Sequence, residues 1–129
     1  MDFVIVVVVL ALIQFIAFGI LVGHARSKYN VAAPASSGDP IFERYNRVHL
    51  NTLEQLVCFL PAIFIYSHVG NANIAAGLGV VYLIGRLVYL RSYIADPASR
   101  GIGFALTMLP TLFMLLASLV IVIRNLITG

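Results

Sequence analysis

The stretch FERYNRVHLNTLE, residues 42–54, decides how this chain folds, because it carries charged and amide side chains directly into an apolar segment. On a helix, at about 100° per residue, Arg47, Asn51 and Glu54 fall within about 60° of one another and form one polar stripe. The opposite faces carry apolar side chains: Leu50, Leu53, Val57 and Leu60. The pattern predicts a helix whose polar stripe has a structural or a binding role.

The composition around this stretch is that of a membrane protein. The 129 residues are 61% hydrophobic and 10% charged, and the mean hydropathy is +1.02, values far from those of a soluble domain. Residues 3–23 are interrupted by nothing more polar than Gln14 and, at about 1.5 Å per residue, can cross about 30 Å of hydrocarbon. A signal peptide is the alternative, but Asp2 stands where basic residues belong and no convincing cleavage site follows.

The rest of the chain predicts three further membrane-spanning helices, which together with residues 3–23 use nearly the whole sequence. Residues 24–41 are polar and rich in Pro, Ser and Gly, which predicts a loop, and residues 70–73 predict a tight turn. Asp96 followed by Pro97 is typical of a helix start, with Asp as the N-cap. The three helices are expected over residues 42–67, 74–95 and 97–125. We therefore expect an all-α integral membrane protein, a four-helix bundle forming one domain over residues 1–129.

The positive charges predict the orientation in the membrane. Lys and Arg residues flank the first and third loops, whereas the second loop has none. By the positive-inside rule, the first and third loops are cytoplasmic and both termini face out. The net charge of +3 is therefore a topology signal, and no basic, aromatic-rich surface indicates nucleic-acid binding. We expect a bacterial inner membrane, or the endoplasmic reticulum in a eukaryote.

Charged side chains inside a span cost about 2.5 to 3.5 kcal/mol each, so each of them needs a partner or a function. Arg47 and Glu54 are the deepest charged residues in the second span. They either form an ion pair that fixes helix packing or belong to a binding site, and one pair can do both. In the third span, Arg86, Tyr89 and Tyr93 share one face at offsets of three and seven. That stripe is either an interfacial aromatic belt with an arginine or a second wall of the same site.

The two stripes predict one Arg-rich pocket near the cytoplasmic boundary. Guanidinium groups bind carboxylates through two hydrogen bonds, and Asn51 and Glu54 can meet amide and ammonium groups, so the pocket suits an anionic, peptide-like ligand. The three histidines lie in different segments without Cys or acidic partners at ligand spacing, and no metal site is expected. No serine triad, P-loop or dinucleotide motif is present. The single Cys58 is expected to be a buried apolar residue.

Two segments and one further residue carry a resemblance to a known family. They are FERYNRVHLNTLE, VYLIGRLVYLRSY at residues 81–93, and Arg100. The combination of R-x-x-x-N-x-x-E, R-x-x-Y-x-x-x-Y and a downstream Arg resembles the MAPEG family, the membrane-associated proteins of eicosanoid and glutathione metabolism. Within it, the pattern is similar to the leukotriene C4 synthases and the microsomal glutathione transferases. The match runs from about Arg26 to Arg100 without an evident gap.

The resemblance implies a homotrimer of four-helix subunits in the lipid bilayer. Glutathione would bind between neighbouring subunits near the cytoplasmic side, and a lipophilic small molecule would enter from the lipid. Arg100 matches the catalytic arginine that activates the thiol. The residues assigned to glutathione binding are Arg26, Arg47, His49, Asn51, Glu54, Arg86, Tyr89 and Tyr93. His49 stands where leukotriene C4 synthases have glutamine, and Gln55 where they have tyrosine, so the lipophilic acceptor stays open.

The expected activity is therefore that of a glutathione transferase or peroxidase. A non-catalytic lipid-binding protein of the same fold is the first alternative, and a small four-span multidrug transporter is the second. Such a transporter is expected to carry a carboxylate within its first span, where residues 1–23 offer only Asp2 at the edge. If a helix begins at Asp96 and Pro97, Arg100 lies in its first turn, where the helix dipole adds to the guanidinium charge.

Overall fold

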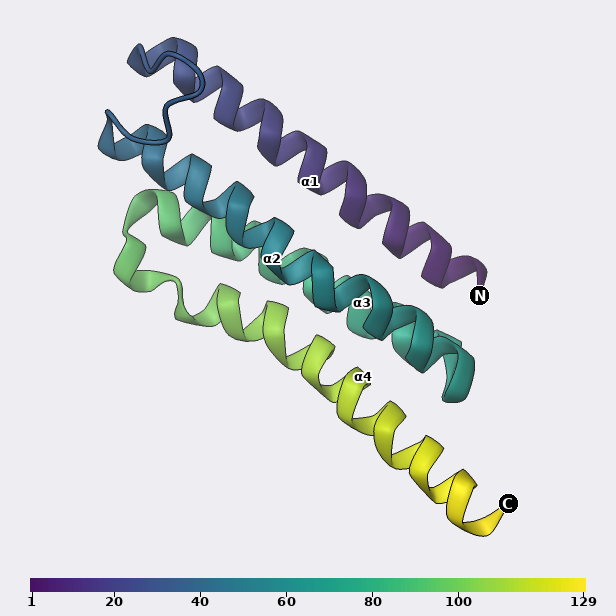
Figure 1. Ribbon diagram of the computed structural model, residues 1–129. Coiled ribbons are helices and arrows are strands. Elements are labelled where there is room, and N and C mark those ends of the chain that lie inside the picture. Colours follow the sequence, from purple (N-terminus) through teal and green to yellow (C-terminus); the bar gives the residue numbers. More distant parts are fainter.

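The protein is a bundle of four long helices in the computed structural model, which describes all 129 residues. The helices are α1 (Asp2–Tyr29), α2 (Pro40–Val69), α3 (Ala72–Ala95) and α4 (Gly101–Thr128), with a short 3-10 turn, η1 (Pro97–Ser99), before α4. Both termini and the α2–α3 turn lie at one end of the bundle, and the α1–α2 loop and η1 lie at the other (Figure 1). The predicted all-α, four-helix fold is confirmed.

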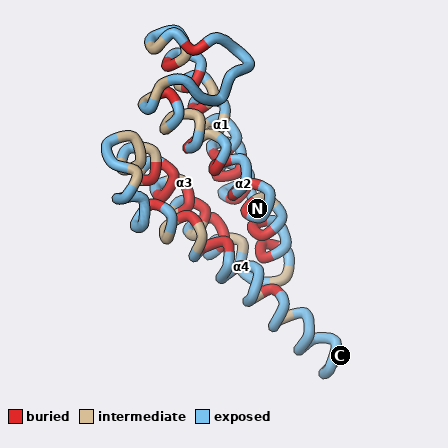
Figure 2. Tube along the Cα trace, turned by 60° about the vertical axis from the view of Figure 1, so that its left-hand side comes forward, coloured by how far each residue is buried: buried red, intermediate tan, exposed pale blue.

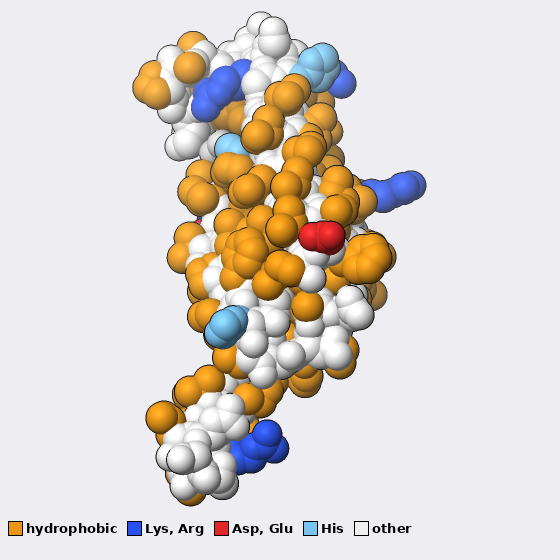
Figure 3. All heavy atoms as spheres, turned by 90° about the vertical axis from the view of Figure 1, so that its right-hand side faces the viewer, with side chains coloured by type: hydrophobic (Ala, Val, Ile, Leu, Met, Phe, Trp, Pro, Cys, Tyr) orange, Lys and Arg blue, Asp and Glu red, His pale blue; other side chains and the backbone are white.

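All four helices are long and apolar enough to cross a bilayer. Their outward faces are apolar: only 32 of the 129 residues are buried, and many large hydrophobic side chains are exposed. Figure 3 shows one such face, with hydrophobic atoms over most of its middle and few charged groups among them. An exposed apolar surface of this extent is stable in contact with lipid chains and not with water. The chain is therefore an integral, multi-pass membrane protein.

The first helix is longer than the sequence predicts. Residues 24–29, expected to be part of a loop, continue α1, which ends where Asn30 takes a left-handed conformation with φ 57° and ψ 45°. The Asn30 N–H donates to the carbonyl of Arg26 and closes the last turn. The loop prediction fails for these residues because loss of apolarity marks the end of a membrane span, whereas a helix continues until a residue terminates it.

The other helix starts are set by side-chain caps. Asp39 accepts hydrogen bonds from the backbone N–H groups of Ile41 and Phe42, both at 2.9 Å, so α2 begins at Pro40. Asn71 caps α3 in the same way, which makes the α2–α3 turn shorter than the predicted residues 70–73. Each cap satisfies backbone donors that no helical carbonyl reaches.

The start of α4 differs from the prediction. Asp96 does accept a hydrogen bond from Ala98 N–H at 3.1 Å, but Pro97 opens the 3-10 turn and the α-helix begins at Gly101. The Ser99 hydroxyl lies near two carbonyls, those of Ser92 at 3.0 Å and Asp96 at 2.8 Å, which stabilises the separate turn. Arg100 is consequently the N-cap residue of α4 and not part of its first turn.

The core lies along the line where the helices meet, as the buried residues in Figure 2 show. The largest cluster has 13 buried residues and includes Phe59 of α2, which stacks on Tyr82 of α3 with ring centroids 3.8 Å apart. Gly79 lets α3 approach α1, since a Cβ there would lie 2.4 Å from Val7 Cγ1. Cys58 is exposed on α2, which contradicts its predicted burial; a side chain that faces lipid can be as apolar as one in the core.

Two glycines allow α3 and α4 to pack closely toward the loop end of the bundle, the end that carries the α1–α2 loop and η1. A Cβ on Gly103 would lie 2.4 Å from the backbone nitrogen of Tyr89, and one on Gly85 would lie 2.8 Å from the carbonyl carbon of Leu106. Backbone approaches this close are possible only where no side chain intervenes. They place the first residues of α4 directly beside the Tyr89 region of α3.

Candidate functional site

A cleft of about 390 Å³ lies between α2, α3 and the start of α4. It is lined by Arg47, Asn51, Tyr89, Tyr93, Arg100 and Phe104. The first five were predicted as site residues, and they come from three segments that are far apart in the sequence. The i, i+4 spacing on α2 and on α3 places each pair on one helix face, and the glycine packing of α4 adds Arg100.

A second cavity of about 480 Å³ adjoins this cleft, because Arg47 and Tyr93 line both. Its other lining residues are Ser36, Pro40, Glu43, Arg44, Asn46, Leu50 and Pro97. Arg44 donates to the carbonyl of Ile94 at 2.8 Å and thereby ties α2 to the end of α3. The cleft is therefore continuous with a polar depression that reaches the loop end of the bundle.

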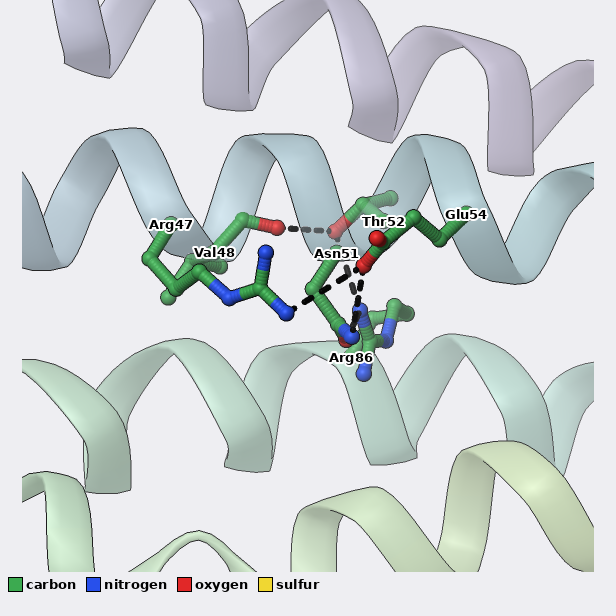
Figure 4. Close-up of polar contacts among 6 residues, drawn as sticks. All are labelled: Arg47, Val48, Asn51, Thr52, Glu54 and Arg86. Atoms are coloured by element: carbon green, nitrogen blue, oxygen red, sulfur yellow. Dashed lines mark hydrogen bonds and ion pairs between the residues drawn. The ribbon is translucent and has the colours of Figure 1, made fainter. Parts of the chain in front are cut away.

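Residues of the polar stripe of α2 interact with one another. Arg47 Nη2 and Glu54 Oε1 lie 3.5 Å apart, and their side chains are 50% and 56% exposed. Asn51 Nδ2 donates to the same Glu54 oxygen at 3.3 Å. Figure 4 shows the three side chains beside one another along α2. A half-exposed pair of this kind contributes little to stability, and the Arg47 and Glu54 charges remain accessible to a ligand.

Arg86 is the buried centre of the site. Its guanidinium is fully buried and donates to Asn51 Oδ1 at 2.9 Å, to Thr52 Oγ1 at 3.1 Å and to Thr107 Oγ1 at 3.0 Å. The same group lies 4.4 Å above the Tyr89 ring, in a cation–π contact. No carboxylate is among its partners, and Nη2 has none. Arg86 does not line the cleft; it holds Asn51 so that the amide nitrogen of Asn51 faces Glu54 (Figure 4).

The remaining wall of the cleft is aromatic and cationic. The rings of Tyr89 and Tyr93 are stacked with centroids 5.5 Å apart. Arg100 is exposed at the N-terminus of α4, and its carbonyl accepts the Phe104 N–H at 3.0 Å. Its guanidinium charge and the positive end of the α4 dipole lie at the same place, so the electrostatic potential there favours an anion.

Two predicted residues lie elsewhere in the chain. The His49 ring stacks on Phe15 of α1 with centroids 4.5 Å apart. Arg26 Nη1 donates to the carbonyl of Ala35 at 2.6 Å, and its guanidinium lies 4.7 Å from the centre of the Phe42 ring. Neither lines the cleft. A single chain therefore brings seven of the nine predicted residues to the cleft or directly behind it, and leaves Arg26 and His49 beside α1 and the first loop.

Comparison with known proteins shows the family of the chain. Residues 3–120 match the sequence profile of the MAPEG family. The chain belongs to the MAPEG family. It is 39% identical over 117 residues to the uncharacterized protein sll1147 of Synechocystis sp., covering 91% of this chain and 85% of that protein. It is also similar to microsomal glutathione S-transferase 2 of Homo sapiens, at 36% identity over 91 residues, or 70% of this chain and 62% of that one.

A third MAPEG relative is leukotriene C4 synthase of Bos taurus, at 32% identity over 83 residues. That match covers 64% of this chain and 55% of the bovine protein. The chain thus spans between half and two thirds of the length of these two mammalian relatives. The family profile and the two mammalian matches agree with the family resemblance that the sequence motifs indicate.

The sequence did not point to three residues that shape this MAPEG site. Thr52 and Thr107 accept hydrogen bonds from Arg86, and Gly103 allows the contact with Tyr89. Threonine and glycine are common in membrane helices, so neither stood out. The one available signal was position: Gly103 and Thr107 are four residues apart and therefore share the α4 face that meets Arg86.

Proposed function

We propose that this MAPEG protein is a membrane-bound glutathione transferase with peroxidase capacity, which binds glutathione and activates its thiol. The observation that carries the proposal is the convergence of Arg47, Asn51, Tyr93 and Arg100 on one cleft between three helices. One relative is named as a glutathione S-transferase, which supports the same substrate.

Glutathione matches the chemistry of the cleft group by group. It carries two carboxylates, one ammonium group, two amides and a thiol. Arg47 offers a bidentate fork to a carboxylate, and Glu54, already within 3.5 Å of Arg47, offers a carboxylate to the ammonium group. The amide oxygen of Asn51 accepts a hydrogen bond from Arg86, so its amide nitrogen is left to donate to a peptide carbonyl.

Arg100 supplies the activation step. A thiol with a pKa of about 8.5 is only a few per cent thiolate at pH 7, and the thiolate is the nucleophile. A guanidinium beside the sulfur, together with the α4 dipole, stabilises the anion. Lowering the thiol pKa from about 8.5 to about 6.5 requires about 2.7 kcal/mol of differential stabilisation. The thiolate would then predominate at neutral pH.

Two reactions follow from an activated thiolate. With a lipophilic electrophile, the sulfur forms a bond to carbon, and a leaving group departs with the electron pair of its bond. With a lipid hydroperoxide, the sulfur takes the terminal oxygen and releases the lipid alcohol; a second glutathione then reduces the sulfenic acid to glutathione disulfide and water. The exposed apolar faces of the helices give both kinds of acceptor a route from the bilayer.

A homotrimer accounts for the two predicted residues that lie apart. Arg26 and His49 are on the α1 side of the chain, whereas Arg47 and Arg100 are on the side of the cleft. In a cyclic oligomer, each subunit presents both sides to different neighbours. Arg26 and His49 of one subunit would then complete the cleft of the next.

The test is a turnover assay on the detergent-purified protein with glutathione and either an aromatic chloride or an organic hydroperoxide. The wild type is expected to turn over at least one of them, and Arg100→Ala is expected to lose at least 90% of the rate at neutral pH, about 1.4 kcal/mol of barrier. The matched control is Arg124→Ala, an exposed arginine near the other end of α4. Glutathione binding without turnover in the wild type would favour the non-catalytic alternative.

A further inference from the structure

A groove separate from the glutathione cleft lies on the α1–α3 side of the bundle. It has a volume of about 450 Å³ and is lined by Leu21, Tyr45, Leu90, Arg91, Ile94 and Ala95. It shares no residue with the cleft. Arg91 and Tyr93 are two residues apart on α3, or about 200° around the helix, so the groove and the cleft open on different sides of α3.

A smaller cavity extends the groove toward the end of α1. It is lined by Leu21, His24, Ala25, Lys28, Tyr29 and Tyr45, with a volume of about 60 Å³. Leu21 and Tyr45 line both spaces, which makes them one elongated depression. Leu21 and Lys28 are seven residues apart on α1, so the depression runs roughly 10 Å along the helix toward the loop end.

The larger space is mostly apolar, and each of the two spaces is bordered by one Lys or Arg side chain. Leu21, Leu90 and Ile94 pack on the buried cluster of Phe18, Val48 and Tyr89, which forms an apolar floor. Arg91 and Lys28 are exposed and take part in no ion pair, since Arg47–Glu54 is the one ion pair in the chain. No acidic residue lines either space. Two unneutralised cations therefore border an apolar trough.

We propose that this depression binds a phospholipid with an anionic headgroup. The trough lies between spans of a membrane protein, so its apolar part is open to acyl chains. Long basic side chains reach from such a position to the headgroup level. The basic end of the bundle is the predicted cytoplasmic end, where anionic lipids concentrate and each nearby Lys or Arg is worth about 1 kcal/mol. Tyr29 and Tyr45 are suited to the same interface.

The experiment is native mass spectrometry of the detergent-purified protein titrated separately with phosphatidylglycerol and phosphatidylcholine of identical acyl chains. The wild type is expected to bind phosphatidylglycerol at least tenfold more tightly. Lys28→Gln and Arg91→Gln are each expected to lower this preference about fivefold, the factor for about 1 kcal/mol, and the double variant to remove it. Arg124→Gln, which removes an exposed cation elsewhere, should keep it.

Other results would overturn the proposal. If the double variant keeps the full preference, or if Arg124→Gln lowers it equally, the anionic lipid is not held at these two residues. Equal binding of glycerol 3-phosphate would show a simple anion site without a role for the acyl chains. A double variant that loses its oligomeric state but not its lipid preference would assign the groove to a neighbouring subunit. Glutathione binding, measured in parallel, tests the cleft separately, because neither residue lines it.

Discussion

The Arg86 guanidinium of α3 donates through Nη1 to Oδ1 of Asn51 on α2, at a distance of 2.9 Å. This bond joins a fully buried cation to an amide that lines the cleft. Because the amide oxygen is committed to Arg86, the amide nitrogen is the group that faces Glu54 and the ligand. A buried charge without a carboxylate partner is costly inside a membrane. The Arg86 charge is explained by its role in orienting the Asn51 amide.

Arg86→Met is therefore expected to raise the KM for glutathione about tenfold, because Asn51 loses its fixed orientation. The variant also leaves buried acceptors unsatisfied, at about 1–3 kcal/mol each, and lowers the melting temperature. The matched control is Thr107→Val, which removes a different acceptor of Arg86 and leaves the Asn51 bond in place. Steady-state kinetics and thermal unfolding in detergent check both variants. An equal rise in KM for the control would show that Arg86 has only a structural role.

Gly103→Ala is expected to separate α4 from α3 and to lower turnover severalfold. The added Cβ would lie 2.4 Å from the Tyr89 backbone nitrogen, and overpacking of this kind costs about 1–3 kcal/mol. Gly101→Ala is the control, since a Cβ there meets nothing within 4 Å. Turnover and melting temperature are measured for both. Wild-type turnover in Gly103→Ala would show that the close α3–α4 contact does not position Arg100.

Glu54→Gln is expected to weaken glutathione binding about tenfold and to change stability by less than about 0.5 kcal/mol. The Arg47–Glu54 pair is half exposed, and pairs of this kind contribute little to folding. Isothermal titration and thermal unfolding separate the two effects. A large loss of stability with unchanged affinity would identify the pair as a packing element of α2 and not as part of the binding site.

The oligomer proposal predicts complementation between inactive chains. Arg26→Ala together with His49→Ala damages one side of the chain, and Arg47→Ala damages the other. Co-expressed in equal amounts, the two variants are expected to recover about a quarter of the wild-type activity, because that fraction of cyclic contacts joins two intact sides. Turnover of the co-purified mixture is compared with that of each variant alone. No recovery would place the complete site within one chain.

The fold and the α2 and α3 stripes could be predicted from the sequence. Four apolar runs are each long enough to span a bilayer as a helix, and helical geometry places regularly spaced residues on one face. The ends of the helices were harder to predict from the sequence. Arg100 was expected in the first turn of α4, yet Ser99 and Pro97 form a separate turn that makes it the N-cap residue. The sequence shows that such residues favour turns, but the path of the backbone depends on hydrogen bonds to α3.

Which stripe residues face the cleft also depended on packing. Helical spacing placed Arg86, Tyr89 and Tyr93 on one face, but the structure buries Arg86 behind Asn51 and leaves Tyr93 at the surface of the cleft. Depth within the bundle depends on Thr52, Thr107 and the glycines of α3 and α4. His49 belongs to the same stretch as Arg47, but it lies two residues away, about 200° around α2, and turns toward Phe15 of α1.

Activation of the glutathione thiol by Arg100 is tested most directly by the ultraviolet difference spectrum of bound glutathione as a function of pH. Thiolate absorbance in the wild type is expected to persist down to about pH 6.5, because a lowered thiol pKa keeps the anion until the pH falls through it. In Arg100→Ala, the thiolate should appear only as the pH rises toward about 8.5, the pKa of the free thiol. Identical titration curves for the two proteins, with glutathione bound to both, would contradict the assignment of Arg100 as the activating residue.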